Sequence, residues 1–281
     1  MAALNFDMGD IGGGTPPFSV KETLYILEDF LQPNSTLSLE GAIDSMVPFL
    51  PNSNQRADRY GFALLCLEFA EQIPYTHIYS PPEVSSTFRV SWKESEGTCN
   101  RYQELGEAIR DRFSWPDKDN PSEYVNYQAF VANIEACHIF RSDPTYAIWT
   151  MRDAFEETHK AGIIRDAYIL GAAQHILWSG QYVFQQLLFP GDISDSDRRK
   201  WSPGPLYRGD GVEPLLTLHR WHFWANSFKA VAMEKNSSDE CKAVAKKAAS
   251  LMNFIERDMT FDNLTNEPRK GRFYRLFQWL R

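Results

Sequence analysis

Residues 163–189, IIRDAYILGAAQHILWSGQYVFQQLLF, are apolar on two sides when they are placed on a helix. The two stripes contain Leu170, Leu177, Phe184 and Leu188 on one side, and Tyr168, Ala172, Ser179 and Tyr182 on the other. A surface helix has one apolar stripe, whereas a helix with two lies between other elements. This segment therefore predicts a central helix that other helices cover on more than one side.

The rest of the chain shows helical periodicity over most of its length and no strand-period segment of any length. Helices are expected at about 19–31, 39–50, 57–73, 100–115, 123–140, 143–160, 218–235, 239–259 and 272–280, with a weak helix or a loop at 86–97 and a long ordered loop at 192–214. The sequence thus predicts an all-α fold, a single domain at 19–281 with roughly eight to ten packed helices in an antiparallel bundle or irregular array. Residues 1–18, which hold four of the sixteen glycines, are expected to form a flexible, disordered arm.

Composition excludes some classes of function. The formal net charge is -8, which argues against nucleic-acid binding because phosphate recognition needs a basic surface. The four cysteines lie far apart in the sequence and show no metal-ligand spacing, as expected for free thiols in a reducing compartment. The N-terminus does not resemble a signal peptide, and no apolar run is long enough to cross a membrane. We expect a protein of the cytoplasm, with the nucleus as an alternative, that needs no metal or other cofactor.

Residues 218–228, LHRWHFWANSF, are unusually rich in aromatic side chains. On a helical wheel Trp221, Trp224 and Phe228 share one arc of about 120°, while His222 falls outside it. This spacing favours a core face over a ligand cage, although Trp221 remains a candidate ligand-binding residue. His219 and His222 are three residues apart, but no third metal ligand lies on the same face, so we predict no metal site.

The best polar constellation lies on the central helix. Its members fall within about 100° of one another on the helical wheel: Arg165, Tyr168, His175, Ser179, Tyr182 and Gln186. Buried polar groups need partners, so each side chain either bonds a neighbouring helix or lines an internal pocket. If there is a pocket, His175 is the candidate acid or base and Arg165 the candidate anion-binding residue. Tyr168, Ser179 and Tyr182 are then candidate ligand-binding residues.

Two further segments have alternative interpretations. The prolines and glycines of residues 203–211 suggest either a lid over a cleft or a rigid loop that places Leu206 and Tyr207 in the core; we favour the rigid loop. Tyr207 is kept as a candidate binding residue.

The C-terminal stretch RKGRFYRLFQWLR is basic within an acidic protein. It either binds a membrane surface or a partner, or docks on the acidic body of the protein; we favour docking.

Several segments together resemble a known family. They are EYVNYQAFVANI, AIWTMRDAFEE, RDAYILGAAQHILWSGQYVF, GPLYRGDG, RWHFWANSFKAVA and AKKAASLMNFIE. In this order they resemble a filamentous-fungal family known only as domain of unknown function DUF3632, from about Leu24 to Met259. The most specific marks are residues 204–207 and 220–224. The resemblance implies an all-helical intracellular fungal protein and supplies no catalytic residues.

Two functions stay open. The first is the handling of a small apolar or anionic molecule, as an accessory protein or enzyme of fungal specialised metabolism, in a pocket between helices 163–189 and 217–235. The second is a non-catalytic helical module that binds a partner protein. The chain has no Gly-rich phosphate loop, no G-x-S-x-G elbow and no Cys/His nucleophile pair, which favours the second. The polar line of the central helix favours the first.

Overall fold

The computed structural model describes residues 6, 20–32, 34–49, 56–76, 103–137, 143–207 and 216–259. These residues form α-helices and one short 3-10 helix, Val47–Phe49, and include no β-strand. The α-helices are α1 (Val20–Leu31), α2 (Leu39–Met46), α3 (Arg56–Gln72), α5 (Gln103–Arg112), α6 (Pro121–Ala136), α7 (Thr145–Phe155), α8 (Ile163–Leu188), α9 (Asp195–Lys200), α10 (Leu218–Met233) and α11 (Asp239–Met259). The all-α prediction is confirmed. The predicted elements at 86–97 and 272–280 lie outside the described residues.

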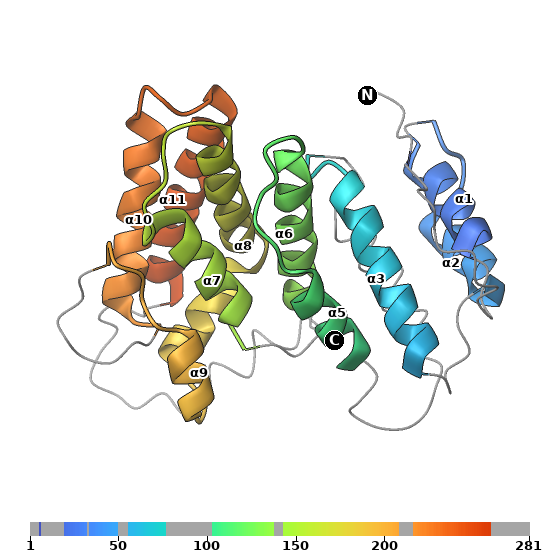
Figure 1. Ribbon diagram of the computed structural model, residues 1–281, viewed down its shortest axis with the longest axis horizontal. Helices are drawn as coiled ribbons and strands as arrows, with labels where there is room; N and C mark the ends of the chain where they lie inside the picture. Colours follow the sequence, from blue (N-terminus) through green and yellow to red (C-terminus); the bar gives the residue numbers. More distant parts are fainter. Residues whose placement is uncertain are drawn as a thin grey trace.

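The helices lie side by side along the long axis of the molecule (Figure 1). Helices α1 and α2 pack together at one end, and α10 and α11 pack together at the other. Between them, α3 contacts α5 and α6, α6 contacts α8, and α8 contacts both α7 and α11. None of the described helices is both long and apolar enough to cross a membrane.

Helix α8 has the central position that its two apolar stripes predicted. Every residue from Asp166 to Ile176 is buried, so this stretch of the helix is covered on all sides. Gly171 permits this close packing, because a Cβ atom there would lie 2.6 Å from Cε1 of Tyr124 on α6. Such a contact is shorter than van der Waals packing allows, so a larger residue would push α6 and α8 apart.

Two clusters of buried apolar side chains form the core. One is built mainly from α7, α8, α10 and α11, and the other mainly from α1, α2, α3 and α5. Helix α6 contributes to both, with Tyr124 and Val125 in the first cluster and Tyr127 and Phe130 in the second. The two opposite faces of α6 therefore connect the two halves of the structure.

The aromatic arc of α10 is a core face, as its spacing predicted. Trp221, Trp224 and Phe228 have no exposed surface (0% each), and Trp221 packs against Phe184 of α8 with ring centroids 4.9 Å apart. Thr217 caps the start of this helix, because its hydroxyl group accepts a hydrogen bond from the backbone N–H of Arg220. The segment is therefore a well-formed helix with its aromatic side in the interior.

The structure differs from the sequence predictions in two segments. The expected loop at 192–214 begins with the short helix α9, capped by Ser194, whose hydroxyl oxygen accepts a hydrogen bond from Asp197 N at 3.2 Å. Six residues are too few to show a helical period, so the cap and the charges at its ends were the only signals.

The second difference concerns the expected arm. Phe6 is buried, and its ring meets that of Phe69 edge-on, with ring centroids 5.3 Å apart. At least this residue contributes to the core.

Candidate functional site

His175, the predicted acid or base, lies in a buried polar cluster between α6, α7 and α8. The side chain has no exposed surface (0%), and its Nε2 lies 3.0 Å from Oε1 of Gln128. The same Oε1 accepts a hydrogen bond from the hydroxyl group of Thr150 at 3.2 Å. On the other side of the ring, Nδ1 lies 3.6 Å from Oε2 of the buried Glu135. We call these four residues the His175 cluster.

The His175 cluster contains buried polar atoms without hydrogen-bond partners among the described residues. They are His175 Nδ1 and Gln128 Nε2, and the hydroxyl group of the neighbouring Tyr124. Because Gln128 Oε1 is an acceptor, the ring donates from Nε2, and Nδ1 then faces the carboxyl group of Glu135. A distance of 3.6 Å is too long for a hydrogen bond, so these two atoms face each other without forming one.

The other residues of the predicted polar line belong to different surroundings. Ser179 donates a hydrogen bond to the backbone carbonyl of His175 at 2.9 Å, within α8. Tyr168 stacks on the ring of His159, with centroids 4.4 Å apart. Tyr182 is half-buried, and burial, helped by the negative charge of Glu135, raises its pKa to about 12. The line is therefore not the wall of a single pocket.

Arg165 lies on α8 ten residues before His175, a rise of about 15 Å along the helix. Its Nη1 donates to Oε2 of Glu234, on α10, at 2.9 Å. The two residues proposed to act together are thus far apart, and the anionic partner of Arg165 in this structure is a protein carboxylate.

A cleft of about 430 Å³ lies where Arg165 meets Glu234, between the end of α7, the start of α8 and the second half of α10. We call it the α8–α10 cleft. Its lining residues are Ala154, Phe155, Glu157, Thr158, His159, Ala161, Arg165, Leu206, Ser227, Ala230, Val231 and Glu234. Of the residues predicted from the sequence, the cleft contains Arg165 and has Tyr168 directly behind His159. The polar side chains that line the cleft include one permanent cation, two carboxylates and two hydroxyl groups.

His159 is held in a fixed orientation at the edge of the cleft. Its Nε2 lies 2.5 Å from the backbone carbonyl oxygen of Asp153, and its ring stacks on Tyr168. A carbonyl oxygen only accepts hydrogen bonds, so Nε2 carries the proton and Nδ1 of the neutral ring is an acceptor. Asp153 is largely buried, and this burial raises the pKa of its carboxyl group. His159 is therefore held at a defined place in the lining of the cleft.

Next to the cleft, a buried ion pair joins α7, α10 and the segment between α9 and α10. The side chains of Glu156 and Arg220 are 0% and 1% exposed. Arg220 donates from Nε to Glu156 Oε1 at 2.7 Å and from Nη2 to Oε2 at 3.0 Å. Trp224 Nε1 donates to Oε1 at 2.8 Å, and the backbone N–H of Gly204 donates to Oε2 at 2.7 Å. We call this arrangement the Glu156 clasp.

The clasp explains the conformation of residues 201–207. Arg220 Nη1 donates to the carbonyl of Trp201 at 2.6 Å, and Leu206 N donates to the carbonyl of Glu156 at 2.9 Å. A Cβ atom on Gly204 would lie 2.6 Å from that same carbonyl oxygen, so only glycine fits here without a shift. The segment is a rigid loop, as favoured from the sequence, and its backbone is bound to the end of α7.

The prediction that this loop places Leu206 in the core is wrong. Leu206 is 49% exposed and lines the α8–α10 cleft, because the clasp holds the backbone of the loop while the side chain points outward. Tyr207 is half-buried, lies against Phe223 with ring centroids 5.2 Å apart, and forms a hydrogen bond through its hydroxyl group with Nδ1 of His219 at 2.7 Å. Trp201, at 6% exposure, is the loop residue that enters the core.

A family model described as "Protein of unknown function (DUF3632)" matches residues 65–228, more than half of the chain. The chain belongs to the DUF3632 family. A comparison with curated proteins gave no match, and neither did a comparison with solved structures.

The DUF3632 match includes the Glu156 clasp, the His175 cluster and most of the lining of the α8–α10 cleft. The two most specific marks of the resemblance, residues 204–207 and 220–224, meet at Glu156 in the folded protein. These two segments therefore supply the groups that contact Glu156 in the Glu156 clasp. Helix α11 lies after the matched region.

Sequence reasoning missed Glu156, Glu135 and His159. Glu156 and Glu135 lie at or near the ends of their helices, and nothing in their own segments indicated burial. One signal was available: Arg220 falls at the edge of the aromatic arc of α10, about 20° from Val231 on the helical wheel. A buried arginine needs an anionic partner, so its position predicted a buried carboxylate without saying which one.

Proposed function

We propose that this DUF3632 protein binds a small molecule with an apolar part and an anionic group in the α8–α10 cleft. The observation that carries the proposal is the partly exposed guanidinium of Arg165 inside a cleft of about 430 Å³. Ligand sites in proteins commonly have volumes of about 300–1,000 Å³, with a few polar groups on an apolar surface. The place agrees with the pocket expected between helices 163–189 and 217–235.

The polar groups of the cleft support an anionic ligand group at one position. Within the described part of the chain, Arg165 makes one hydrogen bond, to Glu234, and a guanidinium has five N–H donors. A ligand carboxylate can accept from the remaining donors without breaking the ion pair. The hydroxyl groups of Thr158 and Ser227 and the acceptor Nδ1 of His159 add further hydrogen-bonding positions.

The apolar part of the ligand has matching surface. Leu206 is exposed at the cleft, and Ala230 and Val231 line it from α10. Burying this surface gives roughly 25 cal/mol for each Å² of apolar area removed from water. The negative charge of Glu157 opposes a ligand with several anionic groups, which favours a single carboxylate on an apolar body.

The cellular setting is also part of the proposal. We infer an intracellular protein, in the cytoplasm or nucleus of a fungus, that handles an intermediate of specialised metabolism. Catalysis by His175 stays a prediction, since that side chain lines neither the cleft nor the surface of α10 and α11. A protein-interaction module is the second candidate function, and it rests on a basic surface of α10 and α11 rather than on the cleft.

Ligand-observed NMR with a library of small aliphatic and aromatic carboxylates tests the cleft. Ala230 is exposed and lines it, so Ala230→Trp fills the cleft without disturbing the core. The matched control is Ala243→Trp, at an exposed alanine of α11 outside the cleft. We expect carboxylates that bind the wild-type and Ala243→Trp proteins but not Ala230→Trp.

Arg165→Gln supplies the second arm of the test, because it removes the cation and keeps a hydrogen-bonding side chain. We expect Kd to rise about tenfold, or 1.4 kcal/mol, for the carboxylates found with the wild-type protein. Circular dichroism checks that each variant is folded. If no carboxylate binds the wild-type protein with a Kd below about 1 mM, or if binding survives Ala230→Trp, the proposal is wrong.

A further inference from the structure

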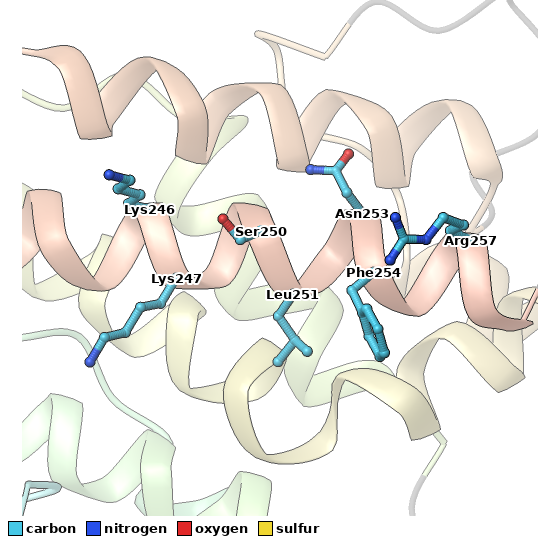
Figure 2. Close-up of a pocket in the computed structure, with 7 residues that line it drawn as sticks. All are labelled: Lys246, Lys247, Ser250, Leu251, Asn253, Phe254 and Arg257. Atoms are coloured by element: carbon cyan, nitrogen blue, oxygen red, sulfur yellow. The ribbon is translucent and has the colours of Figure 1, made fainter.

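Two hollows lie next to each other, the first along α11 and the second between α10 and α11. The first, of about 650 Å³, is shown in Figure 2 and is lined by Lys246, Lys247, Ser250, Leu251, Asn253, Phe254 and Arg257. The second, of about 370 Å³, is lined by His222, Ala225, Asn226, Lys229, Asn253, Glu256 and Arg257. Both include Asn253 and Arg257, so they are parts of one surface, which we call the α10–α11 groove.

The side chains of the groove leave α11 on two sides. In Figure 2, Lys246, Asn253 and Arg257 lie on the side of α11 that is nearer to α10, while Lys247, Leu251 and Phe254 point the opposite way. The basic residues thus lie along the helix from Lys246 to Arg257, a length of about 17 Å at 1.5 Å per residue. The groove offers an elongated surface rather than a single point of attachment.

Four cations of the groove have no carboxylate partner within 4.0 Å among the described residues. They are Lys229, Lys246, Lys247 and Arg257. Elsewhere, most basic side chains are paired, including Arg56, Arg59, Arg110, Arg112, Arg152, Arg165, Lys200, Arg220 and Lys242. In a chain with a net charge of -8, these unpaired cations on adjacent parts of α10 and α11 form a surface that is complementary to an anionic partner.

One carboxylate, that of Glu256, lines the groove. Glu256 Oε1 lies 2.7 Å from Nε2 of His222, so this carboxylate is engaged with α10. Apolar surface lies beside the charges: Phe254 is 47% exposed, and the guanidinium of Arg257 lies 5.6 Å from its ring centroid. A complementary ligand therefore has several carboxylates and at least one apolar side chain.

We propose that the α10–α11 groove binds an acidic segment of a partner protein. Its carboxylates would pair with Lys246, Lys247 and Arg257, and an apolar side chain would lie on Phe254 and Leu251. A segment of about five extended residues, or about ten helical ones, covers the length of the groove.

The charge distribution of the whole molecule favours a short segment over a large polyanion. Residues 20–46 and 56–76 carry eight acidic and three basic side chains, so the far end of the molecule is acidic. A membrane or a nucleic acid would extend beyond the groove and meet this repulsion, whereas a short peptide stays within a Debye length of about 8 Å from the groove. The proposal uses none of the residues that line the α8–α10 cleft, so each can fail without the other.

Fluorescence anisotropy with labelled peptides of about ten residues tests the proposal. Each peptide combines several Glu or Asp residues with one Leu or Phe, and its matched partner has Gln or Asn at every acidic position. The test variant is Lys246→Glu with Lys247→Glu. The control is Lys21→Glu with Lys160→Glu, which changes the net charge equally at exposed lysines away from the groove. All four side chains are exposed, so both double variants are expected to fold, and circular dichroism checks this.

The expected result is that acidic peptides bind the wild-type and control proteins alike and bind the Lys246/Lys247 variant at least about tenfold more weakly. Phe254→Ala should weaken the same peptides less. The proposal is overturned if the neutral peptides bind as tightly as the acidic ones, or if the Lys246/Lys247 variant binds like the control. It is equally overturned if phosphatidylserine vesicles or duplex DNA bind more tightly than every acidic peptide, or if size-exclusion chromatography shows self-association that the Lys246/Lys247 variant abolishes.

Discussion

Two buried carboxylates, Glu156 and Glu135, are 0% and 1% exposed but have very different surroundings. The two carboxylate oxygens of Glu156 accept four hydrogen bonds, from Arg220, Trp224 and Gly204. Glu135 Oε2 faces Nδ1 of His175 at 3.6 Å, and that nitrogen has no hydrogen-bond partner in the described residues. The two carboxylates are therefore equally buried but differ in the geometry of these contacts.

The largest effect is expected from Glu156→Gln. The amide keeps the shape of the side chain but removes the charge that balances Arg220, and its NH2 group faces N–H donors. Removing one partner of a buried ion pair commonly costs about 3–5 kcal/mol, and we expect a loss of unfolding free energy in that range. Equilibrium denaturation in urea measures it.

The same substitution at Glu135 is the matched control for this comparison. An amide there can donate to Nδ1 of His175, so we expect Glu135→Gln to cost clearly less, about 1–2 kcal/mol at most. Equal losses for the two variants would show that the two buried carboxylates do not differ in the way the geometry indicates.

Gly204→Ala tests the clasp from the backbone side. The added Cβ would lie 2.6 Å from the carbonyl oxygen of Glu156, so the loop or the end of α7 must move. We expect a loss of about 1–3 kcal/mol, as for overpacked sites, measured by the same denaturation. Gly191→Ala is the control, since no atom lies within 4 Å of its added Cβ. A neutral result at Gly204 would contradict the tight fit of the loop.

His175→Gln examines the His175 cluster directly. Gln128 keeps its hydrogen bond from Thr150, so the variant is expected to lose about 1–2 kcal/mol, less than Glu156→Gln. If His175 also acts as an acid or base, the variant folds but does not restore the phenotype of a strain from which the gene has been deleted. Full complementation by the stably folded variant would end the catalytic hypothesis for this residue.

The smallest effect concerns Tyr182 and alkaline pH. Burial, with the nearby charge of Glu135, raises the pKa of this phenol in the folded protein to about 12, above the ordinary value of 10.0. The unfolded chain then releases this proton at a lower pH than the folded protein does. The contribution to the free energy of unfolding is therefore complete below pH 10 and is lost as pH rises toward 12. Between pH 10 and 12, the free energy of unfolding measured by denaturation should fall less steeply with pH for Tyr182→Phe than for the wild-type protein. Identical slopes would argue against the raised pKa.

Some features followed from short stretches of sequence. The two apolar stripes of residues 163–189 predicted the central position of α8, and the aromatic spacing of residues 221–228 predicted the core face of α10. Ser38 caps α2, because its hydroxyl oxygen accepts a hydrogen bond from Gly41 N at 3.1 Å. Each of these depends on periodicity or on contacts within a few residues, which a single segment contains completely.

Only the tertiary structure decided which polar groups meet. Glu156 and Arg220 are 64 residues apart, and His175 and Gln128 are 47 apart. The sequence placed Arg165 and His175 on one face of one helix, but the packing of α10 gives Arg165 a partner in Glu234, while the packing of α6 gives His175 its own. The period of a helix determines which face is buried, and it holds no information on which residue of another helix will lie opposite. That depends on how all the helices pack together, since the free energy of burying a polar group is set by its partners and not by its neighbours in sequence.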